Sequence, residues 1–113
     1  MRVLVCGGRD YYDAETMEKV LANCLVPDTD VVIHGGARGA DALAGDIAGR
    51  VLGFPVEVYP ADWYSHGKAA GPIRNQKMLD TGIDLVLAFP GGRGTADMIR
   101  RARKAGVKVR KIA

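Results

Sequence analysis

Short, continuous hydrophobic runs recur along the chain and end at glycine, proline or aspartate. The first run, Val3 to Cys6, stops at two glycines, which is typical of a strand buried on both faces of a sheet. Similar runs occupy residues 31–33, 56–59 and 85–89, and a weaker one spans residues 107–112. The pattern therefore predicts five strands.

Between these runs the apolar positions follow the period of a helix, first over residues 17–25 and again over residues 40–48. A third helix is expected to begin at Pro72 and stop at Gly82, and a fourth to run from about Thr95 to Ala105. Strands that alternate with helices predict right-handed β-α-β crossovers. We therefore expect a Rossmann-like, three-layer α/β fold with a mostly parallel sheet, in a single domain of residues 1–113.

The composition is that of an ordinary globular domain, with 48% hydrophobic and 26% charged residues. The 15 glycines exceed the average and cluster in a few turns. The net charge of +3 favours an anionic small ligand but does not by itself indicate nucleic-acid binding. Cys6 and Cys24 lie in apolar segments and are expected to be reduced core residues. The chain offers no zinc ligand set, and neither a metal nor a cofactor is predicted.

The first hydrophobic run is far too short for a signal peptide, and no apolar stretch approaches the length that spans a membrane. These features predict a cytoplasmic protein with no membrane partner.

Glycine-rich turns follow the first, second and fourth predicted strands, at the edge where parallel α/β sheets bind ligands. The amides of such a turn, at the start of a helix, can bind phosphate, because glycine allows close approach and the helix dipole favours an anion. The candidate ligand-binding residues of the first two turns are Gly7, Gly8, Arg9, Gly35, Gly36, Arg38 and Asp41. Asp41 could bind a ribose hydroxyl or cap the next helix.

The turn after the fourth strand, Pro90 to Asp97, repeats this arrangement, and its candidates are Gly91, Gly92, Gly94 and Thr95. Thr95 could cap the helix or bind a phosphate oxygen. Asp97 falls in the first helical turn, where a carboxylate suits the dipole but would repel a phosphate.

The segment after the third strand adds Asp62, Trp63, Arg74 and Asn75 as further candidates. Trp63 could stack on a base or belong to the core, and Arg74 with Asn75 offers polar contacts near a helix start. The basic run of residues 100–104 fits the exposed face of a helix and its C-terminal end, although it could also contact nucleic acid.

Ordered along the chain, these motifs resemble those of the DUF2493 proteins, the YspA-like (YAcAr) branch of the SLOG superfamily, which also includes the LOG and DprA proteins. The matching segments are residues 6–10, 34–41, 60–63, 71–76 and 89–97. The resemblance implies a Rossmann-like domain that binds nucleotides or nucleotide-derived signals, in bacterial conflict or stress systems or in phages. It also implies a homodimer, or a larger homo-oligomer, by analogy with LOG relatives.

LOG enzymes cleave the N-glycosidic bond of nucleoside monophosphates with an Arg in Arg-x-x-x-Met and a Glu that closes Pro-Gly-Gly-x-Gly-Thr-x-x-Glu. Arg74, followed by Met78, matches the first motif, but the position of the Glu is Met98. Asp97 lies one residue earlier, and one residue turns a helical side chain by about 100°. Arg74 and Asp97 are therefore the candidate catalytic residues, with Asp41 or Asp62 as other sources of a carboxylate.

The leading hypothesis is a domain that binds or senses a nucleotide. The first alternative is a LOG-like phosphoribohydrolase that uses Arg74 and an aspartate. A weaker one, suggested by DprA, is single-stranded DNA binding through Arg100, Arg101 or Lys104.

Overall fold

The computed structural model describes all residues, 1–113, and contains one five-stranded sheet. Its strands are β1 (Arg2–Cys6), β2 (Val31–His34), β3 (Val56–Val58), β4 (Leu85–Ala88) and β5 (Lys108–Lys111). They lie in the order β3-β2-β1-β4-β5, and all neighbouring strands are parallel. The predicted Rossmann-like α/β fold is confirmed.

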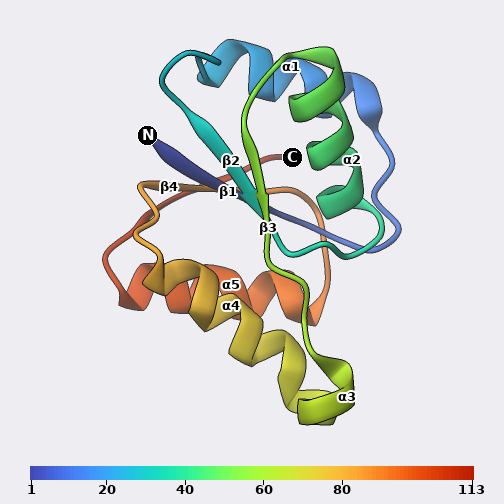
Figure 1. Ribbon diagram of the computed structural model, residues 1–113, viewed down its shortest axis with the longest axis vertical. Coiled ribbons are helices and arrows are strands. Elements are labelled where there is room, and N and C mark those ends of the chain that lie inside the picture. The colour runs from blue at the N-terminus through green and yellow to red at the C-terminus, as the bar shows by residue number, and fades with distance from the viewer.

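Helices cover both faces of the sheet (Figure 1). One layer holds α1 (Ala14–Cys24) and α2 (Ala40–Asp46), and the wider turn η1 (Ile47–Val51) continues α2. The other layer holds α4 (Ala70–Asp80) and α5 (Arg93–Lys104). The short helix α3 (Trp63–His66) and the turn η2 (Gly67–Ala69) lead into α4, and α3 projects away from the sheet in Figure 1.

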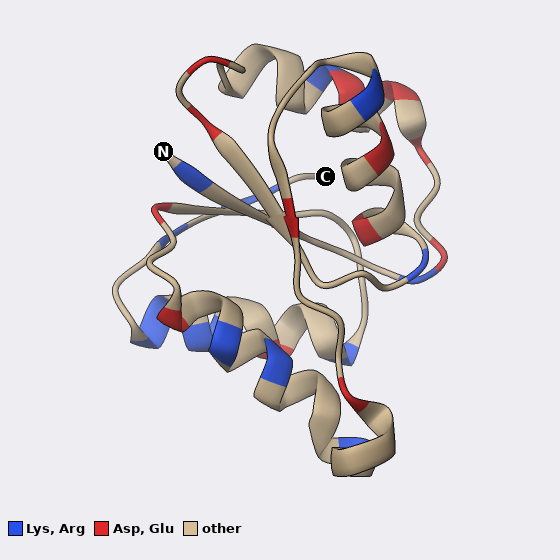
Figure 2. Ribbon diagram, in the orientation of Figure 1, with Lys and Arg blue, Asp and Glu red and all other residues tan.

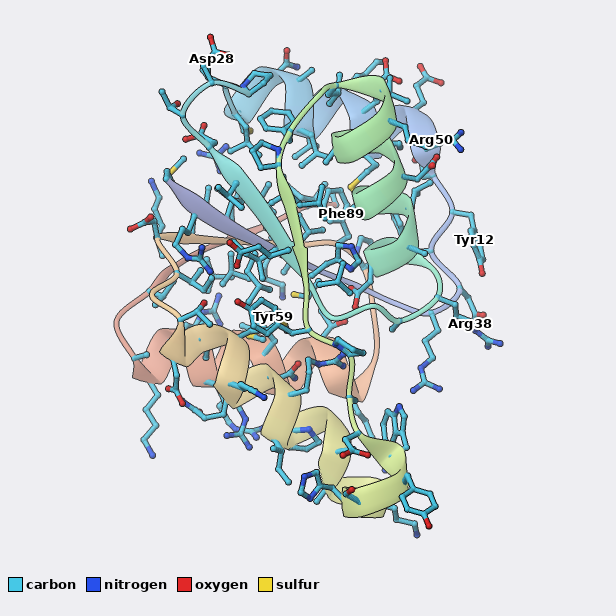
Figure 3. The ribbon with its side chains drawn as sticks, viewed as in Figure 1. Tyr12, Asp28, Arg38, Arg50, Tyr59 and Phe89 are labelled. Atoms are coloured by element: carbon cyan, nitrogen blue, oxygen red, sulfur yellow. The ribbon has the colours of Figure 1, made fainter.

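Alternate residues of the central strands face the two helical layers. Val3 and Val5 pack in the cluster that holds Met17 and Leu21 of α1, whereas Leu4 packs on the opposite side. Phe89, labelled in Figure 3, is fully buried in the α1 and α2 layer. Burial of each such side chain stabilises the fold by about 1.5–3 kcal/mol relative to leaving it exposed. Because both faces of this sheet are covered, every residue of a central strand can be buried in this way, which explains the continuous hydrophobic runs.

Two helix starts differ from the expected positions. Helix α4 begins at Ala70 rather than Pro72, because the chain before it already forms α3, which Asp62 caps by accepting a hydrogen bond from the Ser65 amide at 3.1 Å. Helix α5 begins at Arg93, two residues before Thr95, with Gly92 at its N-cap. Both cysteines are free thiols, but only Cys6 is buried, and Cys24 is half-buried instead of belonging to the core.

The strand order reverses at the boundary between β1 and β4, so the loops that follow these strands lead to opposite faces of the sheet. At their carboxyl ends the two strands remain linked, since the Phe89 amide donates to the Cys6 carbonyl and the Gly8 amide to the Pro90 carbonyl, both at 2.8 Å. The turns after β1 and β4 are therefore held side by side, at the position where open α/β sheets bind ligands.

Candidate functional site

A cleft of about 1080 Å³ opens at this edge of the sheet. Its walls come from the turn after β1, the start of α2, α3, the first half of α4, and the turn between β4 and α5. Among the predicted site residues, those that line it are Gly7, Gly8, Arg9, Asp41, Trp63, Arg74, Asn75, Gly91, Gly92, Gly94, Thr95 and Asp97. Residues from five parts of the fold are thus brought together.

The turn between β4 and α5 presents unoccupied backbone donors to this cleft. Along the chain after Pro90, the Ala96 amide is the first to donate a hydrogen bond to a backbone carbonyl, that of Gly92, at 3.0 Å. The amides of residues 91–95 donate to no backbone acceptor, and no side chain caps the helix. Thr95, which could have been the cap, lies inside α5. Free amides and a helix dipole at one point form an anion site.

The turn between β2 and α2 looks similar in sequence but uses its amides internally. The Asp41 carboxylate accepts hydrogen bonds from the amides of Gly35 at 3.1 Å and Ala37 at 3.2 Å. The Gly36 amide donates to His34 at 3.0 Å. Asp41 is therefore not the N-cap, which is Gly39, and its Oδ2 holds its own turn together. Burial raises the pKa of Asp41, while these amides and the charge of Arg74 oppose the rise.

Arg74 is the central cation of the cleft. Its Nη1 donates to the Gly35 carbonyl at 2.5 Å, and its Nε donates to Asn75 Oδ1 at 3.1 Å. Burial lowers its pKa and the charge of Arg9 lowers it further, whereas Asp41 acts in the opposite direction. Two hydrogen bonds fix the guanidinium plane, and its remaining N–H groups donate to no other group of the protein.

Asn75 connects Arg74 to the first turns of α5. It is buried, and its Nδ2 donates to the Gly94 carbonyl at 3.2 Å and to Asp97 Oδ2 at 3.0 Å. Asp97 also accepts from Arg100 at 2.5 Å and from Arg101 at 2.9 Å. A single network therefore joins the arginine of α4 to the only acidic side chain of α5.

The two residues at the end of the glycine turn motif lie in different environments. Asp97 lines the cleft, with 13% of its side chain exposed. Burial raises its pKa, but hydrogen bonds from Asn75 and Arg101, with the charges of Arg101 and Arg100, outweigh this and lower the pKa. Met98, at the position of the LOG glutamate, is fully buried in the core between the sheet and α5. The cleft thus contains an aspartate anion held by hydrogen bonds and no carboxylate from the next position.

A smaller cavity of about 410 Å³ adjoins the cleft and shares Arg9, Ala37, Trp63 and Arg74 with it. Gly35, Gly36 and Arg38 line this second cavity only. Trp63 is 50% exposed rather than a core residue, and the Arg9 guanidinium lies 5.8 Å from its ring centroid. Asp62 lines neither cavity, since it caps α3.

Several residues of this region were missed by sequence reasoning, among them Lys68 and Arg93, which line the cleft, and a buried histidine. His34, at the end of β2, is buried and accepts the Gly36 amide through Nδ1. Burial and the charge of Arg74 lower its pKa, so the ring is neutral at pH 7 and helps to hold the turn. The sequence feature that corresponds to this buried ring is Gly45. A Cβ at that position would lie 2.5 Å from His34 Nε2, so the histidine needs a residue without a side chain there.

Basic residues gather on one side of the molecule. Figure 2 shows Lys and Arg along α4 and α5, whereas most of the acidic residues belong to α1, α2 and the loops beside them. Two of the cations suggested for DNA binding, Arg100 and Arg101, are paired with Asp97. Their role in the structure is therefore at least partly to hold that carboxylate.

A free-amide turn and a fixed arginine at the β1/β4 switch point place this protein in the class of Rossmann-like α/β domains with a cleft at the carboxyl edge of the sheet. The chain belongs to the YspA, cpYpsA-related SLOG family (YAcAr), whose sequence model matches residues 1–66. It is also 47% identical over 116 residues to the Gene 61 protein of Mycobacterium phage D29, an alignment that covers 96% of this chain and 93% of that protein. None of the helices has the length and apolar character needed to cross a membrane.

Proposed function

We propose that this domain binds a nucleotide or a nucleotide-derived ligand and acts as a sensor or signalling domain. The observation that carries the proposal is the run of free amides at residues 91–95, placed in a large cleft that also contains Arg74. Membership of a SLOG family supports a nucleotide-related role. The phosphate would accept hydrogen bonds from these amides and pair with the Arg74 guanidinium.

The rest of the ligand would extend along the cleft toward Trp63. An indole that is half exposed offers a flat apolar face, and the nearby Arg9 adds a positive charge. Gly35 and Gly36 contribute shape instead of donors, because their amides already have acceptors. The arrangement suits a ligand with a phosphate at one end and a planar group at the other.

Binding without hydrolysis is the favoured form of this proposal. A carboxylate that activates water must accept a proton, but the pKa of Asp97 is lowered and its oxygens already accept from Asn75, Arg100 and Arg101. The neighbouring position, Met98, is inside the core. The hydrolytic role of the LOG glutamate thus has no direct equivalent among these side chains.

A LOG-like phosphoribohydrolase is the second candidate, and Asp41 is the observation that favours it. Asp41 lines the cleft beside Arg74, and its raised pKa lies closer to the range that suits proton transfer. Its Oδ2 is occupied by Gly35 and Ala37, so Oδ1 would have to act. In this case AMP would be split into free base and ribose 5-phosphate.

The test is to incubate the purified protein with AMP, other nucleoside monophosphates, NAD and ADP-ribose, and to follow thermal stability and free base together. Arg74→Ala is the decisive variant. Arg50→Ala is its matched control, because Arg50 is an exposed arginine that pairs with Asp46 and lines neither cavity.

A sensor raises its melting temperature with at least one of these nucleotides, releases no base, and loses at least tenfold in affinity on Arg74→Ala but not on Arg50→Ala. Base release that disappears in Arg74→Ala would instead establish the enzyme. An unchanged melting temperature with every compound would overturn the proposed phosphate site.

A further inference from the structure

The smaller cavity beside the cleft is lined by three arginines and by no acidic side chain. Arg9, Arg38 and Arg74 supply all of its charge, and the remaining lining residues are small or apolar, apart from the indole of Trp63. Arg9 and Arg74 line both cavities, whereas Arg38 lines the smaller one alone. The two cavities therefore adjoin, and the positive charge of the site extends beyond the free amides of residues 91–95.

None of these arginines forms a buried ion pair with an acidic side chain. Arg38 Nη2 lies 3.5 Å from Asp10 Oδ1, but 70% of the Arg38 side chain and 94% of the Asp10 side chain are exposed, and such pairs contribute little. One carboxylate oxygen of the buried Asp41 already accepts hydrogen bonds from the amides of its own turn. The charge of Arg9 is close enough to lower the pKa of Arg74. Like charges facing one cavity favour a bound anion.

The segments that carry the three arginines come from different parts of the fold. Arg9 follows β1, Arg38 lies in the turn between β2 and α2, and Arg74 is in α4. Figure 3 labels Arg38 on that turn, next to the chain that follows β1. Guanidinium groups bind phosphate oxygens through paired N–H groups. Three arginines around one cavity therefore suit a phosphate group better than an apolar part of a ligand.

We propose that the smaller cavity is a second phosphate subsite, and that the ligand is a nucleotide with at least two phosphate groups, one on the amides of residues 91–95 and one among Arg9, Arg38 and Arg74. This inference rests on the proposed function, since it extends the same binding site. Trp63 lines both cavities, so its indole stays available to the planar group of such a ligand.

The experiment compares adenosine, AMP, ADP, ADP-ribose and NAD by calorimetry on the wild-type protein, Arg38→Ala and Arg50→Ala. Arg38 is the cleanest probe because it is exposed and touches only the smaller cavity, so its removal should leave the fold intact. One charge-assisted contact is equivalent to roughly tenfold in affinity. We expect at least one two-phosphate nucleotide to bind roughly tenfold tighter than AMP.

Arg38→Ala should remove this gain while changing AMP affinity by less than about twofold, and Arg50→Ala should leave both unchanged. If AMP binds but no two-phosphate nucleotide binds more tightly, or if the gain survives Arg38→Ala, the second subsite is wrong while the proposed function stands. If no nucleotide binds the wild-type protein, the proposed function itself fails.

Discussion

The glycines of the turn between β4 and α5 differ in what a side chain would meet, and this allows a sharp test of the site. A Cβ at position 91 would overlap Thr95 Oγ1 and would lie 2.6 Å from the Gly8 nitrogen and 2.9 Å from the Gly7 carbonyl carbon. Thr95 could rotate, but the backbone of residues 7 and 8 cannot move away alone, since the Gly8 amide donates to the Pro90 carbonyl. Gly91→Ala should therefore push the turns after β1 and β4 apart.

The magnitude follows from these contacts. Overpacking against a fixed backbone costs about 1–3 kcal/mol, and stretching the Gly8 to Pro90 hydrogen bond costs about 1 kcal/mol more. At about 2.1 cal/mol/K per residue, unfolding a chain of 113 residues has an entropy of roughly 240 cal/mol/K near its midpoint. A loss of about 2–4 kcal/mol thus corresponds to a melting temperature lower by roughly 8–17 °C.

Gly94→Ala is the matched control, because Gly94 lies in the first turn of α5 and a Cβ there meets nothing within 4 Å. It should be neutral or stabilise the protein by about 0.4–1 kcal/mol, since alanine restricts the unfolded chain. Both variants are measured by thermal unfolding at one protein concentration without ligand. A Gly91→Ala protein that melts within about 2 °C of the wild type would refute the close approach of the two turns.

Three further predictions concern residues that hold the cleft. Asn75→Ala should lower the free energy of unfolding by about 1–3 kcal/mol, seen in urea titration, because Arg74 Nε loses its acceptor and Asp97 loses a donor. The pKa of Asp97 is lowered in the fold, so its contribution to stability is present above the unfolded value of about 3.9 and is lost as pH falls through the folded value. Asp97→Asn should therefore flatten the acid side of the stability profile below about pH 5, and a profile that stays as steep as the wild type's would contradict the assignment. Gly39→Ala combines a φ of +79° with an overlap on the Gly8 carbonyl oxygen, whereas Gly53→Ala has a φ of +77° and open space. Gly53→Ala should cost about 1–2 kcal/mol in thermal unfolding and Gly39→Ala clearly more, and equal losses would show that contact with residue 8 does not matter.

The sequence was informative about the fold because both faces of the sheet are covered. A strand that must be apolar on each side appears as an unbroken hydrophobic run, and each predicted strand agrees with the observed one to within one residue at either end. Helix α3 was not predicted. It has four residues, none of them buried, so no apolar period marks it, and it is defined by the Asp62 cap and by its contact with α4.

The candidate site was predicted at the level of loops but not of individual donors. The convergence of the turns after β1, β2 and β4 follows from parallel strands, whose carboxyl ends share one edge. Which amides remain free depends on where nearby side chains point. Those directions depend in turn on the residue at which each helix begins, and the sequence did not give these residues for α4 and α5. The network from Arg74 through Asn75 to Asp97 is also tertiary, because it joins two helices whose relative position the sequence does not state.

Two turns with the same spacing show how a helix start decides the chemistry. Asp41 follows Gly35 by six residues, and Asp97 follows Gly91 by six. Helix α2 begins only at Ala40, so Asp41 lies in its first turn and folds back onto the amides of the glycine turn. Helix α5 begins at Arg93, so Asp97 lies further along the helix and faces Asn75. A carboxylate in the first turn acts as a built-in anion, whereas the turn without one leaves its amides with no acceptor in the protein, which is what the proposed phosphate site requires.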